Sequence, residues 1–153
     1  LLDKEIEWAK HILSKYPKLP IAISAKSKEE VKNWPVRHWA KTISKIEDKF
    51  SIVQLGDDSE PVFDHVMRFA GKCSMRESAA LLSQCKLFVG PDSLLMHIAN
   101  GLNIKSIIIF GDGRPVNCLG YPDNINVSLS SRSGHSWQRL EETGELRNQR
   151  WNT

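Results

Sequence analysis

The sequence predicts an α/β domain in which a parallel sheet is covered by helices on both faces. Short, continuously apolar runs alternate along the chain with segments whose apolar residues recur at helical spacing. Strands buried on both faces read as continuous apolar runs, which is typical of parallel sheets. The alternation covers residues 1–127, so we assign one domain to this range and a C-terminal tail of undefined structure to residues 128–153.

The first third of the chain predicts a helix, a strand and a second helix. Residues 3–16 carry apolar side chains at helical spacing, and Pro17 ends the run. Residues 19–24 are a short apolar run, which predicts a buried strand, and the polar residues 26–33 predict a loop. Pro35 suits the first turn of a helix because its missing N–H is not needed there. The expected buried stripe of that helix comprises Trp39, Ile43 and Ile46.

The middle of the chain continues the alternation. Residues 51–55 predict the second strand, and residues 62–69 predict a helix that Gly71 ends. Ser74 and Glu77 have the spacing of a capping box, so a further helix is expected to begin there.

The last elements surround a Gly-Pro break. Residues 87–89 predict a third strand that Gly90-Pro91 interrupts, followed by a helix over residues 93–101. Further strands are expected at residues 106–110 and 125–127. In the tail, a Ser-rich stretch precedes a mostly polar segment, residues 137–146, that predicts one helix.

Composition excludes several classes of protein. No apolar run approaches the roughly 20 residues that a helix needs to cross a bilayer, so at most peripheral membrane contact is expected. The formal net charge of +3 is too small to indicate a nucleic-acid partner, for which a clustered basic surface would be expected. Three widely spaced cysteines form no CxxC pair, which argues against a disulfide framework or a zinc site and favours a reducing cytoplasm.

Ligands of a parallel sheet bind beyond the carboxyl ends of its strands, and the unusual residues of this chain fall there. After the third predicted strand, Asp92 and Ser93 open a helix whose free N–H groups and dipole form an anion site. Asp92 accepts hydrogen bonds and suits sugar hydroxyls, and His97 lies one turn further on. A structural interpretation is equally open, in which Asp92 is only an N-cap and His97 an ordinary helix residue.

Three segments of the sequence together carry a resemblance to a known family. The first is the run VGPDSLLMHIANGLNIKSIIIFG. The second is Lys32-Asn33-Trp34-Pro35 with Trp39 after it, which has the form K-x-W-P…W, and the third is GKCSMRESAALLSQCKLFVGPDS, which predicts a helix, a strand and an Asp-Ser turn in order. The three segments resemble the signature segments of glycosyltransferase family 9, the bacterial heptosyltransferases and their relatives. The matches cover roughly residues 3–127. The resemblance implies the C-terminal, Rossmann-like half of a GT-B glycosyltransferase, which holds a nucleotide-sugar donor and has no obligatory metal.

The resemblance also implies roles for individual residues. Asp92 would bind hydroxyls of the donor sugar, and Ser93 with the following N–H groups would hold the diphosphate, with His97 nearby. Lys32 would bring positive charge to the phosphates. No cofactor is expected beyond the donor itself, for which ADP-heptose is a candidate.

Two further assignments compete with structural interpretations. Lys26 could assist Lys32 at the phosphates, although a solvated lysine is the simpler interpretation. Glu60 lies just beyond the second predicted strand and would accept hydrogen bonds from the ribose hydroxyls, or it is a plain loop acid. Arg114, in the loop after the fourth predicted strand, faces the donor or a partner lobe, or else belongs to a surface turn.

Two departures from the family pattern bear on function. Leu94 stands where the family most often has Gly after Asp-Ser, and its side chain would crowd a phosphate. The loop between Ser24 and Lys32 is also longer than usual.

The family's catalytic base and acceptor site lie in an N-terminal lobe that these residues do not supply. We therefore expect a cytoplasmic, heptosyltransferase-like donor-binding domain. Together with a separate N-terminal lobe it would act on a lipopolysaccharide or other surface glycan at the inner face of the membrane. Alone it would be inactive. The alternative is a non-catalytic nucleotide- or sugar-binding module. The absence of GxGxxG and Walker-type loops disfavours dehydrogenases and P-loop kinases.

Overall fold

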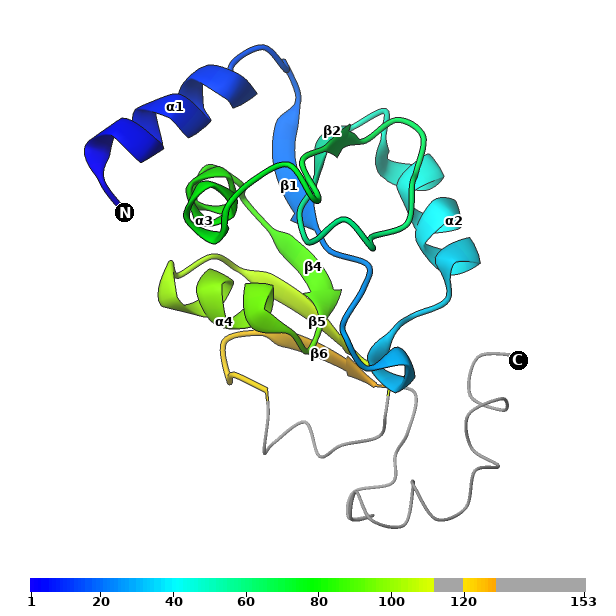
Figure 1. The fold of residues 1–153 in the computed structure, drawn as a ribbon. Helices are drawn as coiled ribbons and strands as arrows, with labels where there is room; N and C mark the ends of the chain where they lie inside the picture. Colours follow the sequence, from blue (N-terminus) through cyan, green and yellow to red (C-terminus); the bar gives the residue numbers. More distant parts are fainter. Residues whose placement is uncertain (112–119, 129–153) are drawn as a thin grey trace, which may run out of the picture.

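The computed structural model describes residues 1–111 and 120–128, and in this part of the chain the strands form one parallel sheet. The strand order is β3-β2-β1-β4-β5-β6, which is the Rossmann order, and the direction of winding reverses between β1 and β4 (Figure 1). The strands are β1 (Leu19–Ile23), β2 (Phe50–Gln54), β3 (Met67–Arg68), β4 (Phe88–Pro91), β5 (Ser106–Phe110) and β6 (Ile125–Ser128). The predicted parallel Rossmann-like sheet is therefore confirmed.

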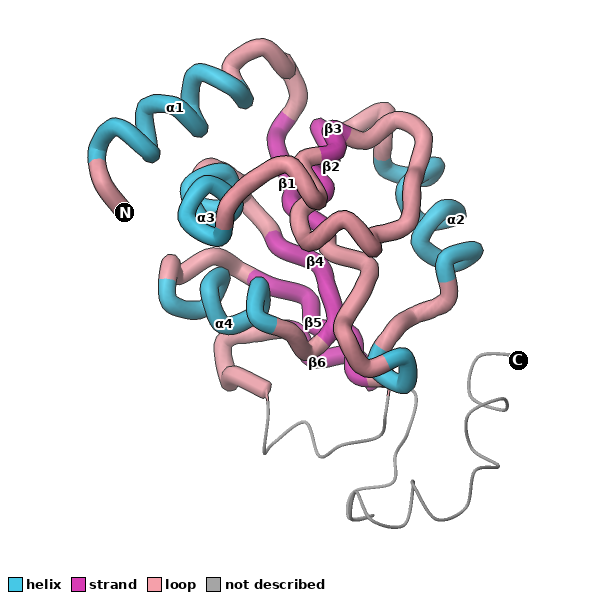
Figure 2. The backbone as a smooth tube through the Cα atoms, viewed as in Figure 1, coloured by secondary structure: helices cyan, strands magenta, loops and turns pink. Residues whose placement is uncertain are grey.

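Helices cover both faces of the sheet (Figure 2). The helices are α1 (Asp3–Leu13), α2 (Val36–Ile46), α3 (Met75–Ser83) and α4 (Leu94–Gly101), with a 3₁₀ turn, η1 (Glu30–Lys32), between β1 and α2. The capping box at α3 is present as predicted: the Glu77 N–H donates to Ser74 Oγ at 3.3 Å, and the Ser74 N–H donates to Glu77 Oε2 at 2.7 Å. The predictions for Arg114 and for the helix at residues 137–146 lie outside the described residues.

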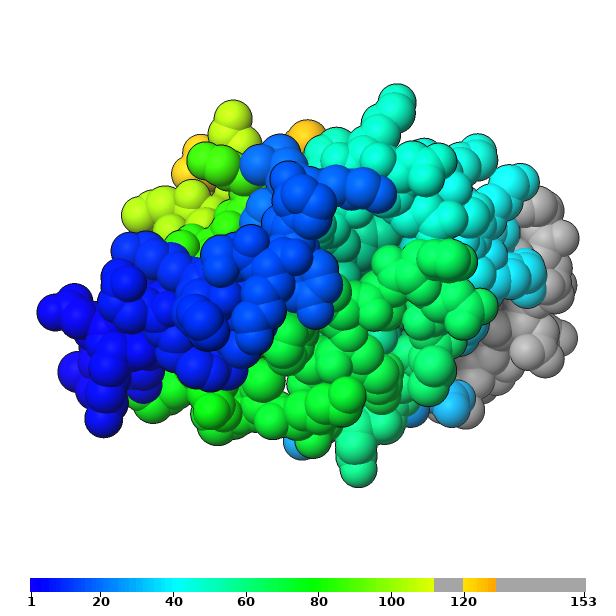
Figure 3. All heavy atoms as spheres, turned by 90° about the horizontal axis from the view of Figure 1, so that it is seen from above, coloured from blue at the N-terminus to red at the C-terminus, as the bar shows by residue number. Residues whose placement is uncertain are grey.

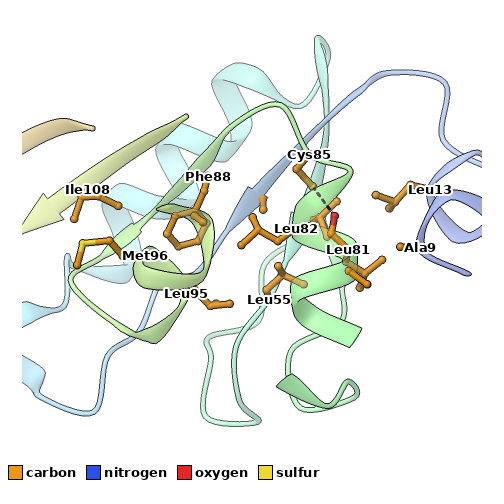
Figure 4. Packing of buried hydrophobic residues seen from close by; sticks show 14 of the residues in the cluster. Ala9, Leu13, Leu55, Leu81, Leu82, Cys85, Phe88, Leu95, Met96 and Ile108 are labelled. Carbon is orange, nitrogen blue, oxygen red and sulfur yellow. Dashed lines mark hydrogen bonds between the residues drawn. The ribbon is translucent and has the colours of Figure 1, made fainter. Parts of the chain in front are cut away.

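The core has two layers because successive strand residues point to opposite faces. Ala22, Val53, Phe88 and Ile108 pack with α3 and α4 in one layer, part of which Figure 4 shows. Ile21, Ile23, Ile52 and Ile109 pack under α2 with Trp39 and Ile43 in the other. Phe88 is fully buried. Burying a side chain of this kind contributes about 1.5–3 kcal/mol, so these two layers account for much of the stability of the sheet.

Helix α1 extends the first layer outward. It packs on α3, and its residues form one end of the molecule in the space-filling view of Figure 3. Arg76 Nε lies 2.6 Å from Glu5 Oε1 and ties the two helices together at the surface. Because α1 contacts α3 rather than the strand ends, it takes no part in shaping the pocket described below.

The predicted helix over residues 62–69 is wrong. Residues 61–66 form an irregular loop, and Met67 and Arg68 form the edge strand β3, paired with Val53 and Gln54 of β2. Val62 is 78% exposed, so the helical spacing of the apolar residues does not correspond to a buried face. Pairing with β2 satisfies the backbone of this segment instead.

The predicted break at Gly90-Pro91 is also wrong. Both residues belong to β4 and pair with Ile108 and Ile109 of β5. A Cβ on Gly90 would lie 2.5 Å from the Phe88 ring and 3.2 Å from the carbonyl oxygen of Ser24. Glycine therefore lets β4 approach the end of β1 closely, and the strand runs on to the residue before Asp92.

Within the described residues, no helix combines the length and the apolar character that crossing a bilayer requires.

Candidate functional site

An open pocket of about 720 Å³ lies at the carboxyl ends of β1, β2 and β4. Its volume is within the range of small-molecule sites, roughly 300–1,000 Å³. Three segments supply most of its wall: residues 24–32 after β1, residues 56–60 after β2, and residues 92–98, which follow β4 and include the first turn of α4. The pocket thus occupies the reversal point of the strand order, where doubly wound sheets bind ligands.

Asp92 and the start of α4 form one wall of the pocket. Ser93 is the N-cap of α4, and its side chain makes no capping hydrogen bond. Asp92 lies one residue earlier and is 7% exposed, so it is not the N-cap that the structural interpretation required. The first N–H groups of a helix have no partner within the helix and carry its positive partial charge. The buried carboxylate of Asp92 therefore lies beside a helix N-terminus that is suited to an anion.

Lys32 reaches the same wall from the end of η1. Its Nζ lies 3.1 Å from Asp92 Oδ2 and 3.4 Å from Glu29 Oε1, and its side chain is 11% exposed. Gly111, after β5, lies against this turn, because a Cβ on it would be 2.7 Å from the carbonyl oxygen of Val31. Lys32 is therefore a largely buried cation at the pocket wall and not a solvated lysine.

Leu94 begins α4, lines the pocket and is 54% exposed. A core role for this side chain is thereby excluded. Its neighbour one turn on, His97, also lines the pocket, and His97 Nδ1 pairs with the Tyr121 hydroxyl at 2.8 Å. The two rings meet edge to face, with centroids 5.8 Å apart. This contact orients the imidazole at the pocket mouth.

Glu60 is buried, at 4% exposed, and faces protein donors. Oε1 accepts from the Ser24 hydroxyl at 2.7 Å, and Oε2 accepts from the Ala25 N–H at 2.8 Å. Burial raises the pKa of Glu60 above its ordinary value, and these donors oppose that shift. A plain loop acid would be solvated, so that interpretation does not hold. A ribose hydroxyl would have to replace one of the present donors, and the predicted ribose contact stays a prediction.

Lys26 lines the pocket and is exposed; its Nζ lies 3.4 Å from the carbonyl oxygen of Ser59. The loop that carries it is held by Asn33, which accepts from the Ser27 N–H at 2.6 Å and donates to the Ser27 carbonyl at 3.2 Å. The structure thus brings Lys26, Lys32, Glu60, Asp92, Ser93, Leu94 and His97 together around one pocket.

Sequence reasoning missed several residues of this region. Lys28, Cys73 and Met75 line the pocket, and Gln54 and Arg68 lie behind it. Gln54 carried a signal, because it is a polar residue inside an apolar strand. Arg68 was missed because the incorrect prediction of a helix over residues 62–69 did not place it beside Gln54 of β2. Among the described residues, no group of three or more His, Cys, Asp or Glu side chains is placed to hold a metal ion.

Comparison with known protein families identifies the chain's family. The model of glycosyltransferase family 9 (heptosyltransferase) matches residues 3–146. This match covers most of the chain, and the chain therefore belongs to glycosyltransferase family 9. No curated protein sequence matches it.

Solved structures agree in fold. The family 9 glycosyl transferase from Veillonella parvula DSM 2008 superposes with a TM-score of 0.79 at 14% identity, covering 99% of this chain and 48% of that one. E. coli ADP-heptose LPS heptosyltransferase II has a TM-score of 0.70 at 18% identity, covering 88% and 45%. E. coli heptosyltransferase WaaC with ADP has a TM-score of 0.65 at 19% identity, covering 91% and 48%. The chain spans about half the length of these structures.

Proposed function

We propose that the pocket binds the diphosphate and sugar of a nucleotide-sugar donor. The observation that supports this most strongly is the pairing of Lys32 with Asp92 beside the N-terminus of α4. A fixed cation and a helix N-terminus together favour a diphosphate. A carboxylate next to them accepts hydrogen bonds from sugar hydroxyls. Both kinds of group are needed to hold a nucleotide sugar.

The remaining pocket residues take supporting roles in this proposal. The Ser93 hydroxyl and the first N–H groups of α4 bind phosphate oxygens, and Lys26 adds a second cation from the loop that also carries Lys32. His97 contacts the donor at the pocket mouth. Glu60 contacts ribose only if a hydroxyl replaces one of its protein donors. ADP-heptose is the donor that the structural neighbours suggest, since one is an ADP-heptose heptosyltransferase and another is solved with ADP.

The proposed reaction is displacement of the nucleoside diphosphate by an acceptor hydroxyl. A general base removes the hydroxyl proton, while Lys32 and the start of α4 stabilise the charge of the departing diphosphate. We assign that base to an N-terminal lobe outside these residues, so the chain alone binds donor without transferring it. The acceptor is a lipopolysaccharide or another surface glycan, and the setting is the cytoplasm at the inner membrane face.

Isothermal titration with ADP, UDP, GDP and their sugar conjugates tests the donor assignment. We expect ADP and an ADP-sugar to bind, and Asp92→Asn to weaken the ADP-sugar more than ADP, because Asp92 faces the sugar. Asp48→Asn, a change at an exposed residue next to α2, is the control. Equal loss for ADP and ADP-sugar would remove Asp92 from the sugar site, and no binding by any nucleotide would reject the donor pocket.

The exposed Leu94 favours a second candidate, a non-catalytic binding module. The isobutyl side chain of Leu94, at the first position of α4, narrows the space through which a phosphate reaches the helix N–H groups. Turnover discriminates between the two candidates. An N-terminal lobe from a family member, added to this chain with an ADP-sugar and acceptor, restores sugar transfer if the chain is an enzyme component. Donor binding without transfer supports the module.

A further inference from the structure

A chain of hydrogen bonds behind the pocket joins the loop after β1 to the loop after β2. Its centre is the Glu60 carboxylate. Oε1 accepts from the Ser24 hydroxyl at 2.7 Å and the Lys26 N–H at 3.1 Å. Oε2 accepts from the Ala25 N–H at 2.8 Å and Gln54 Nε2 at 3.4 Å. Three of the four donors therefore belong to consecutive residues of the loop after β1.

These contacts occupy the hydrogen-bond acceptor positions of the Glu60 carboxylate. Two carboxylate oxygens offer about four acceptor positions, and four protein donors occupy them. Gly56 makes room for this arrangement, because a Cβ there would lie 2.6 Å from Glu60 Oε1, and its φ of +132° suits glycine. Glu60 is thus built into the protein as the link between two loops.

Arg68 holds the other end of this link. Its Nη1 donates to Gln54 Oε1 at 3.1 Å and to the Pro61 carbonyl at 3.0 Å. Its Nη2 donates to the carbonyls of Glu60, at 3.0 Å, and Asp58, at 3.3 Å. The guanidinium therefore binds the backbone of the loop that carries Glu60. The described residues that line the pocket include neither Arg68 nor Gln54.

We propose that Arg68 is a positioning residue for the donor pocket: through Gln54 and Glu60 it fixes the loop after β1, which carries Lys26, Lys28 and Lys32, without touching the ligand. The proposal rests on the donor-binding function proposed above. A loop whose polar backbone groups lack fixed partners opens locally, and ordering it at the moment of binding weakens affinity. Arg68 donates to four acceptors in and beside the loop after β2. The free-energy cost of ordering the loops is therefore met on folding and does not weaken ligand binding.

The Arg68→Met variant tests this positioning role. Amide hydrogen exchange is measured in the ligand-free protein, and affinity is measured for two ligands, ADP and inorganic pyrophosphate. We expect faster amide exchange at residues 24–32 in the ligand-free variant, and roughly tenfold weaker binding of both ADP and inorganic pyrophosphate. Both ligands lose affinity because the disturbed loop carries the lysines that face phosphate. The matched control is Arg76→Met, which removes an exposed arginine whose side chain pairs with Glu5 of α1 and does not line the pocket. It should leave exchange at residues 24–32 and both affinities at wild-type values.

Three results would overturn the proposal. The first is an amide exchange rate at residues 24–32 of Arg68→Met that equals the rate in the wild-type protein. Loss of ADP affinity with unchanged pyrophosphate affinity is another, since it places the effect at the ribose and not at the loop. The third is an equal acceleration of exchange in Arg76→Met, which would indicate general destabilisation.

A milder variant covers the case in which Arg68→Met fails to fold. Arg68→Lys keeps the charge but cannot reach all four acceptors, so a smaller acceleration confined to residues 24–32 and 56–61 is expected. Uniform protection equal to wild type would count against the proposal. The exchange result does not depend on ligand. If wild-type protein binds no ADP, the donor-binding function fails, while exchange still decides whether Arg68 fixes the loop.

Discussion

Two buried carboxylates line the pocket from opposite sides, and they differ in what faces them. Glu60, after β2, accepts hydrogen bonds from neutral groups, among them two backbone N–H groups and a hydroxyl. Asp92, after β4, lies against the Lys32 ammonium at 3.1 Å. In the part of the chain that the structure describes, the Ala25 and Lys26 N–H groups donate to Glu60 and to no other acceptor, whereas an ammonium can exchange a carboxylate for a phosphate. We therefore propose that the Glu60 wall keeps its protein contacts and that the ligand exchanges contacts at the Asp92 wall.

The largest effect is expected from Lys32→Met. Losing a charge-assisted contact with phosphate costs about 1.5–3 kcal/mol, so ADP affinity should fall by roughly ten- to a hundredfold. The unfolding free energy should fall as well, by about 2 kcal/mol or more, because Asp92 stays buried without its ammonium. Lys10→Met is the control, since Lys10 is exposed and pairs with exposed Glu7 on the same helix, α1. Titration calorimetry and denaturant unfolding measure both quantities. Unchanged ADP affinity in Lys32→Met would contradict the assignment of phosphate binding to the Asp92 wall.

A smaller effect of opposite sign is expected from Leu94→Gly. Removing the side chain opens the approach to the helix N–H groups, so ADP should bind a few-fold more tightly. Stability should fall by no more than about 1 kcal/mol, the cost of glycine inside a helix, because Leu94 is 54% exposed. Leu94→Ala separates the causes: it keeps the Cβ and should reproduce the gain only if the isobutyl group is the obstacle. Weaker ADP binding in both variants would make Leu94 a ligand contact.

The smallest effect concerns pH and separates Glu60 from an ordinary carboxylate. Burial raises the pKa of Glu60, so the folded state holds its proton more tightly than the unfolded state does. The stability that this group contributes is full below the unfolded pKa and is lost as pH rises through the folded pKa. Relative to Glu60→Gln, wild-type protein should therefore lose unfolding free energy as pH rises from about 4 to 7.

Glu5 supplies the opposite case on the same molecule. The hydrogen bond from Arg76 lowers the pKa of Glu5 to about 2, so the stability that Glu5 contributes is full above its ordinary pKa and is lost as pH falls through the folded pKa. Denaturant unfolding of Glu5→Gln and wild type from about pH 5 down to about pH 2 should therefore give a difference whose slope with pH is opposite to that of Glu60→Gln. Equal slopes for the two variants would mean that Glu60 is not desolvated.

The sequence predicted the sheet because its strands are continuously apolar. Residues 106–110 and 51–55 have no polar face, which only a doubly covered sheet explains, and Ser74 with Glu77 marked the start of α3. Residues 62–69 misled the prediction because five apolar side chains at helical spacing stand in a loop and an edge strand. Pairing of Met67 and Arg68 with β2 is a long-range interaction that local periodicity does not report.

The candidate site was predicted where local chemistry marks it and missed where it depends on tertiary contacts. Asp92 and Ser93 follow a buried strand and open a helix, a pattern visible in the sequence. The ion pair between Asp92 and Lys32 was not predictable from spacing, since Lys32 lies sixty residues earlier in the chain. The engagement of Glu60 with Ser24 and Ala25 likewise depends on β1 and β2 lying side by side.

An NMR titration of the ¹⁵N-labelled chain with ADP tests most directly whether this pocket binds a nucleoside diphosphate. We expect the largest amide shifts on Ser93, Leu94 and Leu95 at the start of α4, followed by residues 26–32 of the facing loop. Lys32→Met should reduce these shifts at equal ADP concentration. Shifts centred on α1 or α2, or no shifts at millimolar ADP, would contradict the assignment of this pocket to a nucleoside diphosphate.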